Sequence, residues 1–321
     1  MNETKIVFMG TSEFAVASLG ALLMNGMDVA MVVTAPDKPA GRGRKLSLSP
    51  VKEFAEFSSL PVLQPENLEE KAFIDTLKSL NADMFVVVAF RILPKAVWKL
   101  PPMGTINLHA SLLPQYRGAA PINRAIINGE TKSGITTFLI DENVDTGSVL
   151  LQDEVDIYPF ENAGDLHNKL MKLGALLVIR TINGMMHGII KPKAQSLLLN
   201  NHEQVKTAPK IFPADCNINW NESAEKIHNL VRGLSPYPGA RSIMTNGSKN
   251  ISFKIIESFP EKSDHQLAVG TIISEDNKIL KVACNDGFIR ILIIQLEGKK
   301  RMNTDEFLRG FDISPYRAET A

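Results

Sequence analysis

The chain has 321 residues, of which 44% are hydrophobic and 22% charged, a composition typical of a globular protein with room for two domains. Its formal net charge is zero, which argues against a protein that coats nucleic acid non-specifically but leaves room for local basic patches. The sequence contains two cysteines without metal-like spacing, no signal sequence and no apolar stretch of membrane-spanning length. We therefore expect a cytoplasmic protein without a disulfide framework or a metal site.

The first half of the chain alternates strand-like and helix-like segments. Apolar runs typical of buried strands lie at 5–9, 29–34, 61–63, 84–89, 105–108, 135–140 and 149–155. Helical patterns separate them at 14–23, 68–80 and 121–128, and a long helix is expected from about 164 to 186. This alternation predicts an α/β fold with a doubly wound, mainly parallel, Rossmann-like sheet over residues 1–189.

The pattern changes near residue 190, where prolines and scattered lysines replace the regular period. We interpret 190–207 as a linker and 208–321 as a second domain. After a helix at 223–234, short strands are expected at 241–244, 251–256, 269–274, 279–283 and 288–294, with a last helix at 303–309. Turn signals at Asn246-Gly247 and Asp286-Gly287 favour a small OB-like β-barrel.

Two polar side chains stand at the end of one predicted strand, in the run INLHASLLPQYRGAAP at 106–121. Asn107 and His109 are two residues apart, so an extended chain places them on the same side. A strand buried in the core would carry valine or isoleucine at these positions. Polar groups at a strand end are typical of catalytic groups at the edge of an α/β sheet.

A carboxylate, Asp145, follows the next predicted strand, in a turn closed by Gly147. An imidazole beside a carboxylate can move a proton, and a nearby amide can donate to an oxyanion. Together Asn107, His109 and Asp145 suit acyl or formyl transfer to an amine. On chemistry alone a second interpretation stays open, since asparagine and aspartate are common in turns and a lone histidine is often structural.

Sequence motifs point to a known family. The stretch HASLLPQYRGAAP at 109–121 resembles the signature of the folate-dependent formyltransferases, and Asp145-Thr146-Gly147 resembles that family's second motif. The segments FMGTSEFAV (8–16) and TAPDKPAGRGRKLSLSPVK (34–52) resemble the members that act on initiator tRNA. The resemblance covers essentially the whole chain. It implies 10-formyltetrahydrofolate as formyl donor and the α-amino group of initiator methionyl-tRNA as acceptor.

The resemblance also assigns roles to individual residues. It implies that Asn107, His109 and Asp145 are the catalytic trio and that the segment Ser111-Leu112-Leu113-Pro114 binds the folate. The chain departs from the pattern at 89–92, which reads Ala-Phe-Arg-Ile and is one residue shorter than the Tyr-Gly-containing turn of bacterial members. In the family this segment helps to form the pterin pocket. The resemblance therefore implies that Phe90 and Arg91 contact the pterin, and that the shorter segment changes the individual contacts.

Basic residues gather in the loop at 37–49, between glycines that favour a mobile backbone. These are Lys38, Arg42, Arg44 and Lys45, and the linker region adds Lys206 and Lys210. Such a cluster is often no more than a solvated loop. The family resemblance implies instead that this loop enters the acceptor stem of the tRNA, where cations contact phosphates.

Three other functions compete with this hypothesis. A nucleotide formyltransferase of purine synthesis would need no second domain, and an amino-sugar formyltransferase would not need the basic loop at 37–49. A non-catalytic RNA-binding module would use the barrel alone. Binding of NAD is disfavoured because FMGTSEF lacks the second and third glycines of a dinucleotide fingerprint. We expect a monomer that binds the folate donor and tRNA and no membrane.

Overall fold

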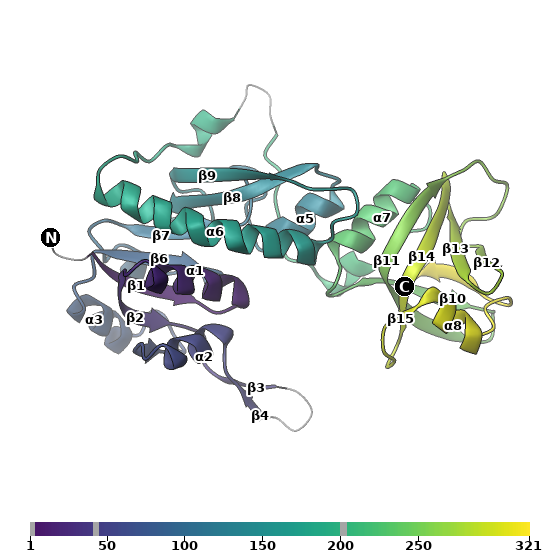
Figure 1. The fold of residues 1–321 in the computed structure, drawn as a ribbon, viewed down its shortest axis with the longest axis horizontal. Helices are drawn as coiled ribbons and strands as arrows, with labels where there is room; N and C mark the ends of the chain where they lie inside the picture. Colours follow the sequence, from purple (N-terminus) through teal and green to yellow (C-terminus); the bar gives the residue numbers. More distant parts are fainter. Residues whose placement is uncertain (1–3, 41–44, 200–203) are drawn as a thin grey trace. The chain divides into compact units, whose positions relative to one another are not determined.

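The computed structural model describes residues 4–40, 45–199 and 204–321, which form two compact units (Figure 1). The first unit contains 1–118, 133–155 and 167–207, and the second contains 119–132, 156–166 and 208–321. Two short segments from the first half of the sequence thus group with the second unit, and residues 190–207 group with the first. The domain division at 189 and 207 stays a prediction. Among the described helices, none is long and apolar enough to cross a membrane.

A seven-stranded sheet forms the centre of the first unit, in the order β5-β2-β1-β6-β7-β8-β9. Its strands are β1 (Lys5–Gly10), β2 (Asp28–Val33), β5 (Val62–Leu63), β6 (Met84–Val88), β7 (Thr105–His109), β8 (Lys132–Leu139) and β9 (Val149–Asp156). The pairs from β5 to β7 are parallel, whereas β7 and β8 are antiparallel. The predicted mainly parallel, Rossmann-like sheet is confirmed, and the buried apolar strand β6 lies beside β7 at its centre.

Helices connect and cover the strands of this sheet. They are α1 (Glu13–Met24), α2 (Pro50–Phe57), α3 (Lys71–Ser79), α4 (Lys95–Trp98) and the long α6 (Ala163–Met186). Helix α6 crosses strands β7 and β8 at Gly174 (Figure 1). A Cβ atom there would lie 2.6 Å from Cδ1 of Ile135 and 2.8 Å from Cδ2 of Leu108, so a larger residue would require these side-chain ends to shift. The helix thereby supports the strand that carries His109.

A short hairpin occupies part of the segment that the sequence predicts as a loop. Strand β3 (Lys38–Ala40) pairs with β4 (Lys45–Ser47), so the prediction of a loop over the whole of 37–49 is wrong. The base of the hairpin is held by Asp37, whose carboxylate accepts hydrogen bonds from the Lys52 ammonium at 2.5 Å and from the Gln64 amide at 2.7 Å. The Lys52 hydrogen bond, followed by that of Gln64, lowers the pKa of Asp37.

An antiparallel sheet forms the second unit, in the order β12-β13-β14-β11-β10-β16, with β15 beside β14. The strands are β10 (Ala240–Thr245), β11 (Asn250–Lys262), β12 (Ile272–Glu275), β13 (Ile279–Cys284), β14 (Gly287–Leu296), β15 (Met302–Asn303) and β16 (Arg317–Thr320). The sheet curls, and a bridge between Thr271 and Arg317 joins its two edges. This agrees with the small barrel expected from the short strands.

The second unit is completed by helices α5 (Pro121–Ile127), α7 (Ala224–Gly233) and α8 (Thr304–Gly310). Short 3₁₀ turns lie at Gln195–Leu198 in the first unit and at Pro213–Cys216 in the second.

Strand β11 is much longer than the 251–256 expected from sequence. Its register shifts on both sides of Glu257, and such irregularities break the period of two on which the prediction depends. Strand β16 was not expected, because its residues, RAET, include one apolar side chain.

A buried histidine, His228 on α7, makes the second unit sensitive to acid. Its side chain is 7% exposed and its Nδ1 lies 3.0 Å from the Ser258 hydroxyl. Burial is the main cause that lowers the pKa of His228 below its ordinary value. The unfolded chain therefore takes up a proton near pH 6.5 that the folded chain resists, and folding loses stability as the pH falls from about 6.5.

We expect the melting temperature of the wild type to fall between pH 7 and pH 5, and to fall less in His228→Gln, which has no proton to take up at this position. Circular dichroism melts at the two pH values measure the difference. His187→Gln is the matched control, because His187 is exposed and its replacement should leave the pH dependence unchanged. An equal fall in the wild type and in His228→Gln would contradict this account.

Candidate active site

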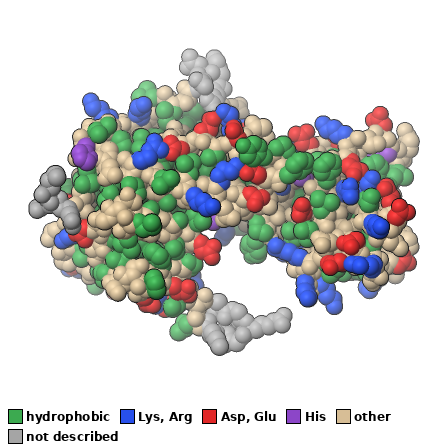
Figure 2. All heavy atoms as spheres, viewed as in Figure 1, with side chains coloured by type: hydrophobic (Ala, Val, Ile, Leu, Met, Phe, Trp, Pro, Cys, Tyr) green, Lys and Arg blue, Asp and Glu red, His purple; other side chains and the backbone are tan. Residues whose placement is uncertain are grey.

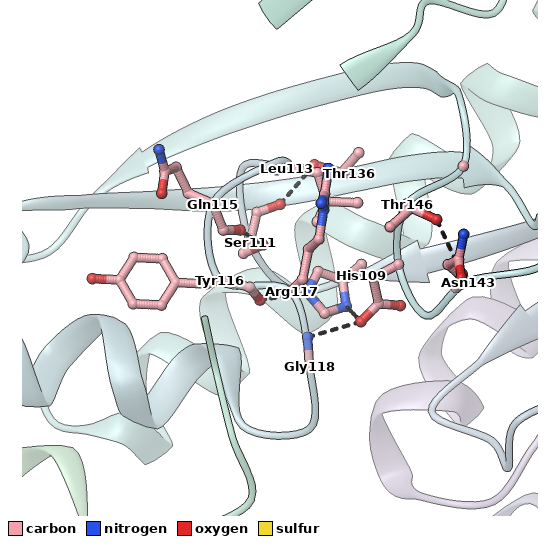
Figure 3. Close-up of polar contacts among 12 residues, drawn as sticks. His109, Ser111, Leu113, Gln115, Tyr116, Arg117, Gly118, Thr136, Asn143 and Thr146 are labelled. Atoms are coloured by element: carbon pink, nitrogen blue, oxygen red, sulfur yellow. Dashed lines mark hydrogen bonds and ion pairs between the residues drawn. The ribbon is translucent and has the colours of Figure 1, made fainter. Parts of the chain in front are cut away.

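The candidate site lies where strand β7 ends in the first unit. Strand β7 runs parallel to β6, and Asn107 pairs with Val87 of that buried strand. Two residues later His109 is the last residue of β7, so the strand presents both side chains on one face. The sequence leaves the strand through a loop, 110–118, that turns back toward the His109 ring (Figure 3).

The imidazole of His109 lies between the Tyr116 carbonyl and the Asp145 carboxylate (Figure 3). It is 7% exposed, and its Nε2 lies 2.9 Å from the Tyr116 carbonyl oxygen. A carbonyl can only accept, so Nε2 carries the hydrogen. The other nitrogen, Nδ1, lies 3.7 Å from Oδ2 of Asp145. Each ring nitrogen thus has an oxygen near it, and the two oxygens together set the orientation of the ring.

The carboxylate of Asp145 is held by the loop that follows β7. Its Oδ2 accepts a hydrogen bond from the Gly118 amide at 2.9 Å. The backbone of Asp145 has φ 55°, a left-handed conformation that a non-glycine residue adopts rarely and at some cost. Gly147 closes the same turn, where a Cβ atom would lie 1.7 Å from the Leu139 carbonyl oxygen. The turn is therefore shaped to bring the carboxylate to His109.

Gln195 supports this turn and was not predicted from sequence. Its side-chain amide donates to the carbonyl oxygens of Asp145 and Gly147, at 2.9 Å in each case. The Gln195 oxygen accepts two hydrogen bonds from the Arg117 guanidinium, at 3.0 and 2.7 Å. Gln195 is 3% exposed and lies in the segment that the sequence analysis interpreted as a linker. No pattern in the sequence connects residue 195 to a turn fifty positions earlier.

Asn107 is half-buried, and within the described residues its side-chain amide has no hydrogen-bond partner. A polar side chain at the end of a central strand usually forms a hydrogen bond with a neighbouring group. The amide of Asn107 is therefore available to a bound molecule. The structure brings His109 and Asp145 together as predicted, with Asn107 two residues before His109 on the same strand.

The loop residues Ser111, Leu113 and Pro114 are buried, while Leu112 is half-buried. The loop is tied to β8 through Thr136, whose hydroxyl donates to the Ser111 carbonyl at 2.6 Å and accepts from the Leu113 amide at 3.1 Å (Figure 3). Gln152 adds a hydrogen bond to the Leu113 carbonyl at 2.8 Å. The loop thus has a fixed shape, and Leu112 is its partly exposed apolar side chain.

The segment after β6 bends sharply at Ala89, which has φ 47°. Phe90 is half-buried against the apolar core of the first unit. Arg91 donates to the carbonyl oxygens of Pro65 and Glu66, at 2.7 and 2.9 Å. Burial lowers the pKa of Arg91. The guanidinium therefore holds the backbone at 65–66, a structural role that the sequence did not indicate.

The predicted basic residues are distributed over both units. Lys38 lies exposed on β3 and Lys206 is exposed in the first unit. Lys210, in the second unit, lies with its ammonium 5.9 Å from the centre of the Phe212 ring. Lys45 is in β4, and its side chain is outside the described residues, as are Arg42 and Arg44.

Comparisons with known proteins identify related families and proteins. Residues 4–182 match the formyl transferase family and residues 210–312 match the formyl transferase C-terminal domain. The chain is 49% identical to a methionyl-tRNA formyltransferase of Bacteroides thetaiotaomicron, over 97% of each chain. It is 48% identical to a methionyl-tRNA formyltransferase of Flavobacterium johnsoniae, over 98% of each chain.

Solved structures share the fold at lower identity. The sugar 3N-formyl transferase WlaRD, solved with 5-N-formyl-tetrahydrofolate, has a TM-score of 0.64 at 22% identity and covers 94% of this chain and 100% of its own. HypX from Aquifex aeolicus, solved with tetrahydrofolic acid, has a TM-score of 0.64 at 15% identity, covering 96% of this chain and 47% of its own. Both share the two-part α/β and antiparallel architecture.

Proposed function

This chain belongs to the formyl transferase family, and from that premise we propose that it transfers the formyl group of 10-formyltetrahydrofolate to the α-amino group of initiator methionyl-tRNA. The observation that carries the proposal is the pairing of His109 with Asp145 at the end of β7, beside the unpartnered amide of Asn107. The relatives named methionyl-tRNA formyltransferase, which match over nearly the whole chain, support the choice of acceptor.

In the mechanism that we propose, 10-formyltetrahydrofolate supplies the formyl group and the amine attacks its carbon. The Asn107 amide and the His109 ring stabilise the oxygen that gains negative charge. Asp145 keeps the His109 ring oriented and receives the amine proton through water. Addition of the amine gives a tetrahedral intermediate, which collapses as the bond to the donor nitrogen breaks. That nitrogen takes up a proton, and tetrahydrofolate leaves. No covalent enzyme intermediate is required.

We propose that the donor binds beside the loop at 111–114 and the bend at 89–91. Leu112 and Phe90 are the half-buried apolar side chains of these segments and fit the flat ring of a pterin. Ser111, Leu113 and Pro114 would act by fixing the backbone of the loop. Arg91 would act indirectly, by holding residues 65–66 behind Phe90.

We propose that the tRNA binds through cations from both units. The acceptor stem would be contacted by four residues of the β3–β4 region, namely Lys38, Arg42, Arg44 and Lys45. The tRNA backbone beyond the acceptor stem would be contacted by Lys206 and Lys210. Residues 208–321 would act as a tRNA-binding domain, with 1–189 as the catalytic domain. The anchored base of the β3–β4 hairpin at Asp37 supports this assignment. Each phosphate contact should add somewhat less than one unit to the log–log salt slope.

A panel of acceptors tests the proposed function. The protein is incubated with 10-formyltetrahydrofolate and, in separate reactions, with charged initiator tRNA, glycinamide ribonucleotide or a nucleotide-linked amino sugar. Release of tetrahydrofolate is followed in each. We expect turnover with the charged tRNA alone. Turnover with either small acceptor and none with the tRNA would make one of the alternative formyltransferases correct, and no turnover with any would favour a non-catalytic RNA-binding protein.

Gln195→Met should lower the turnover number about tenfold, because the Asp145 turn loses two hydrogen bonds and small displacements of catalytic groups are costly. Methionine keeps the volume of the side chain. The Michaelis constants for both substrates should change by less than about twofold, since Gln195 would act only through the turn. Steady-state kinetics with the charged tRNA measure both.

A double variant separates this positioning role from a general loss of structure. In an Asp145→Asn background, Gln195→Met should lower turnover little further, because the residue through which it acts is already altered. Gln115→Met is the matched control, as Gln115 lies in the same unit and hydrogen-bonds to the backbone of Gln204 and Lys206. Full additivity of the two losses would show that Gln195 does not act through Asp145.

A further inference from the structure

An exposed tyrosine stands at the tip of a fixed loop in the second unit. Tyr237 is 80% exposed and follows α7 in the segment Leu234-Ser235-Pro236-Tyr237-Pro238-Gly239. Tyr237 is not a member of the apolar core that the described residues form in this unit. A single exposed apolar residue needs no special explanation. The groups that surround the Tyr237 ring, however, indicate a role in binding.

Hydrogen bonds hold the backbone on both sides of Tyr237. The Pro238 carbonyl accepts from the Lys254 ammonium at 2.8 Å, and the Pro236 carbonyl accepts from the Arg301 guanidinium. The Gly239 amide closes the loop on the Leu234 carbonyl at 2.9 Å. A loop fixed in this way presents the ring at a defined place, so little conformational entropy is lost when a ligand binds.

Positive charge gathers next to this loop. Lys299, Lys300 and Arg301 are consecutive and exposed, in the turn that joins β14 to β15. Within the described part of the chain, no carboxylate lies within 4.0 Å of any of the three. Gln295 fixes the turn by donating to the Lys299 carbonyl at 2.9 Å. Figure 2 shows Lys and Arg side chains gathered around the β14–β15 turn.

We propose that Tyr237 and the cations of the β14–β15 turn form a binding surface for an unpaired nucleotide of the tRNA substrate. The ring stacks on the base, and Lys299, Lys300 and Arg301 contact the flanking phosphates. An exposed aromatic ring on a held backbone, with three cations in the neighbouring turn, matches the two chemical parts of a nucleotide. An acidic peptide would use the cations but would leave the ring without a partner. This inference rests on the proposed function, which supplies the tRNA.

The test measures the dissociation constant of initiator tRNA at several salt concentrations, for the wild type and for variants of the full-length protein. Tyr237→Ala should weaken binding about tenfold without changing the salt slope, because stacking carries no net charge. Lys299→Ala should instead reduce the slope by somewhat less than one unit. Tyr237→Phe should bind as the wild type does, since the ring remains.

Kinetics and an aromatic control complete the experiment. Tyr237→Ala should raise the Michaelis constant for charged tRNA and leave the turnover number and the constant for the folate donor unchanged. Tyr158→Ala, at another exposed aromatic of the second unit, should bind as the wild type does. If the wild type formylates the tRNA and Tyr237→Ala binds it within about twofold of normal, the inference is overturned and the proposed function stands. If the wild type does not formylate the tRNA, the proposed function itself fails.

Discussion

Replacing His109 by alanine should lower the turnover number for formyl transfer by about two orders of magnitude or more. The ring is buried, lies 3.7 Å from the Asp145 carboxylate and is oriented by the Tyr116 carbonyl, so alanine removes the side chain that we propose to act on the reacting atoms. Michaelis constants should change little, because the ring is expected to act on the reacting atoms. Rapid-quench assays with charged tRNA measure the chemical step directly.

The matched control is His187→Ala, which removes an exposed imidazole from the same unit and should leave turnover unchanged. Near-normal turnover in His109→Ala would remove His109 from the mechanism. A large loss accompanied by a lower melting temperature would call for a comparison at a temperature where the variant is fully folded.

Gly147→Ala should have the second largest effect, on both stability and activity. A methyl group at this position would lie 1.7 Å from the Leu139 carbonyl oxygen, a backbone atom that cannot move aside cheaply. We expect the free energy of unfolding to fall by roughly 1–3 kcal/mol. Because the turn that carries Asp145 must shift, turnover should fall by about a hundredfold, the size expected for a displacement near 1 Å. Urea denaturation and steady-state kinetics measure the two effects.

Gly20→Ala gives the comparison for this variant. Gly20 lies within helix α1, where the added methyl group would meet only Phe54 at an ordinary contact distance of 3.5 Å. Alanine in place of glycine inside a helix should raise stability slightly. Equal stability and activity of the Gly147→Ala variant and the wild type would contradict the described shape of the turn.

The sequence predicted the sheet of the first unit well because its strands are buried on both faces. The run at 84–88 is apolar at every position and forms β6 as expected. The second unit was predicted less closely, since its long strand β11 contains register shifts at Glu257. The β3–β4 hairpin was missed because glycines and cations surround it, a composition typical of loops.

The residues of the candidate site likewise include some that the sequence predicts and some that it does not. His109 and Asp145 could be predicted because each lies at a strand end within a recognisable motif, and the structure places them together. Gln195 could not, since its contact with the Asp145 turn depends on the path of a chain segment without regular structure. The assignment of Arg91 to the folate pocket stays a prediction, and its hydrogen bonds to the backbone at 65–66 were not expected from the sequence. Such contacts depend on side-chain geometry that spacing alone does not reveal.

The measurement that tests the central proposal most directly is identification of the product on the tRNA. Charged initiator tRNA is incubated with the protein and 10-formyltetrahydrofolate, the aminoacyl ester is hydrolysed, and the released amino acid is analysed by mass spectrometry. We predict N-formylmethionine, formed over many turnovers by the wild type and greatly reduced with Asn107→Ala, His109→Ala or Asp145→Asn. Recovery of unmodified methionine, while the same protein formylates a different amine, would contradict the proposal.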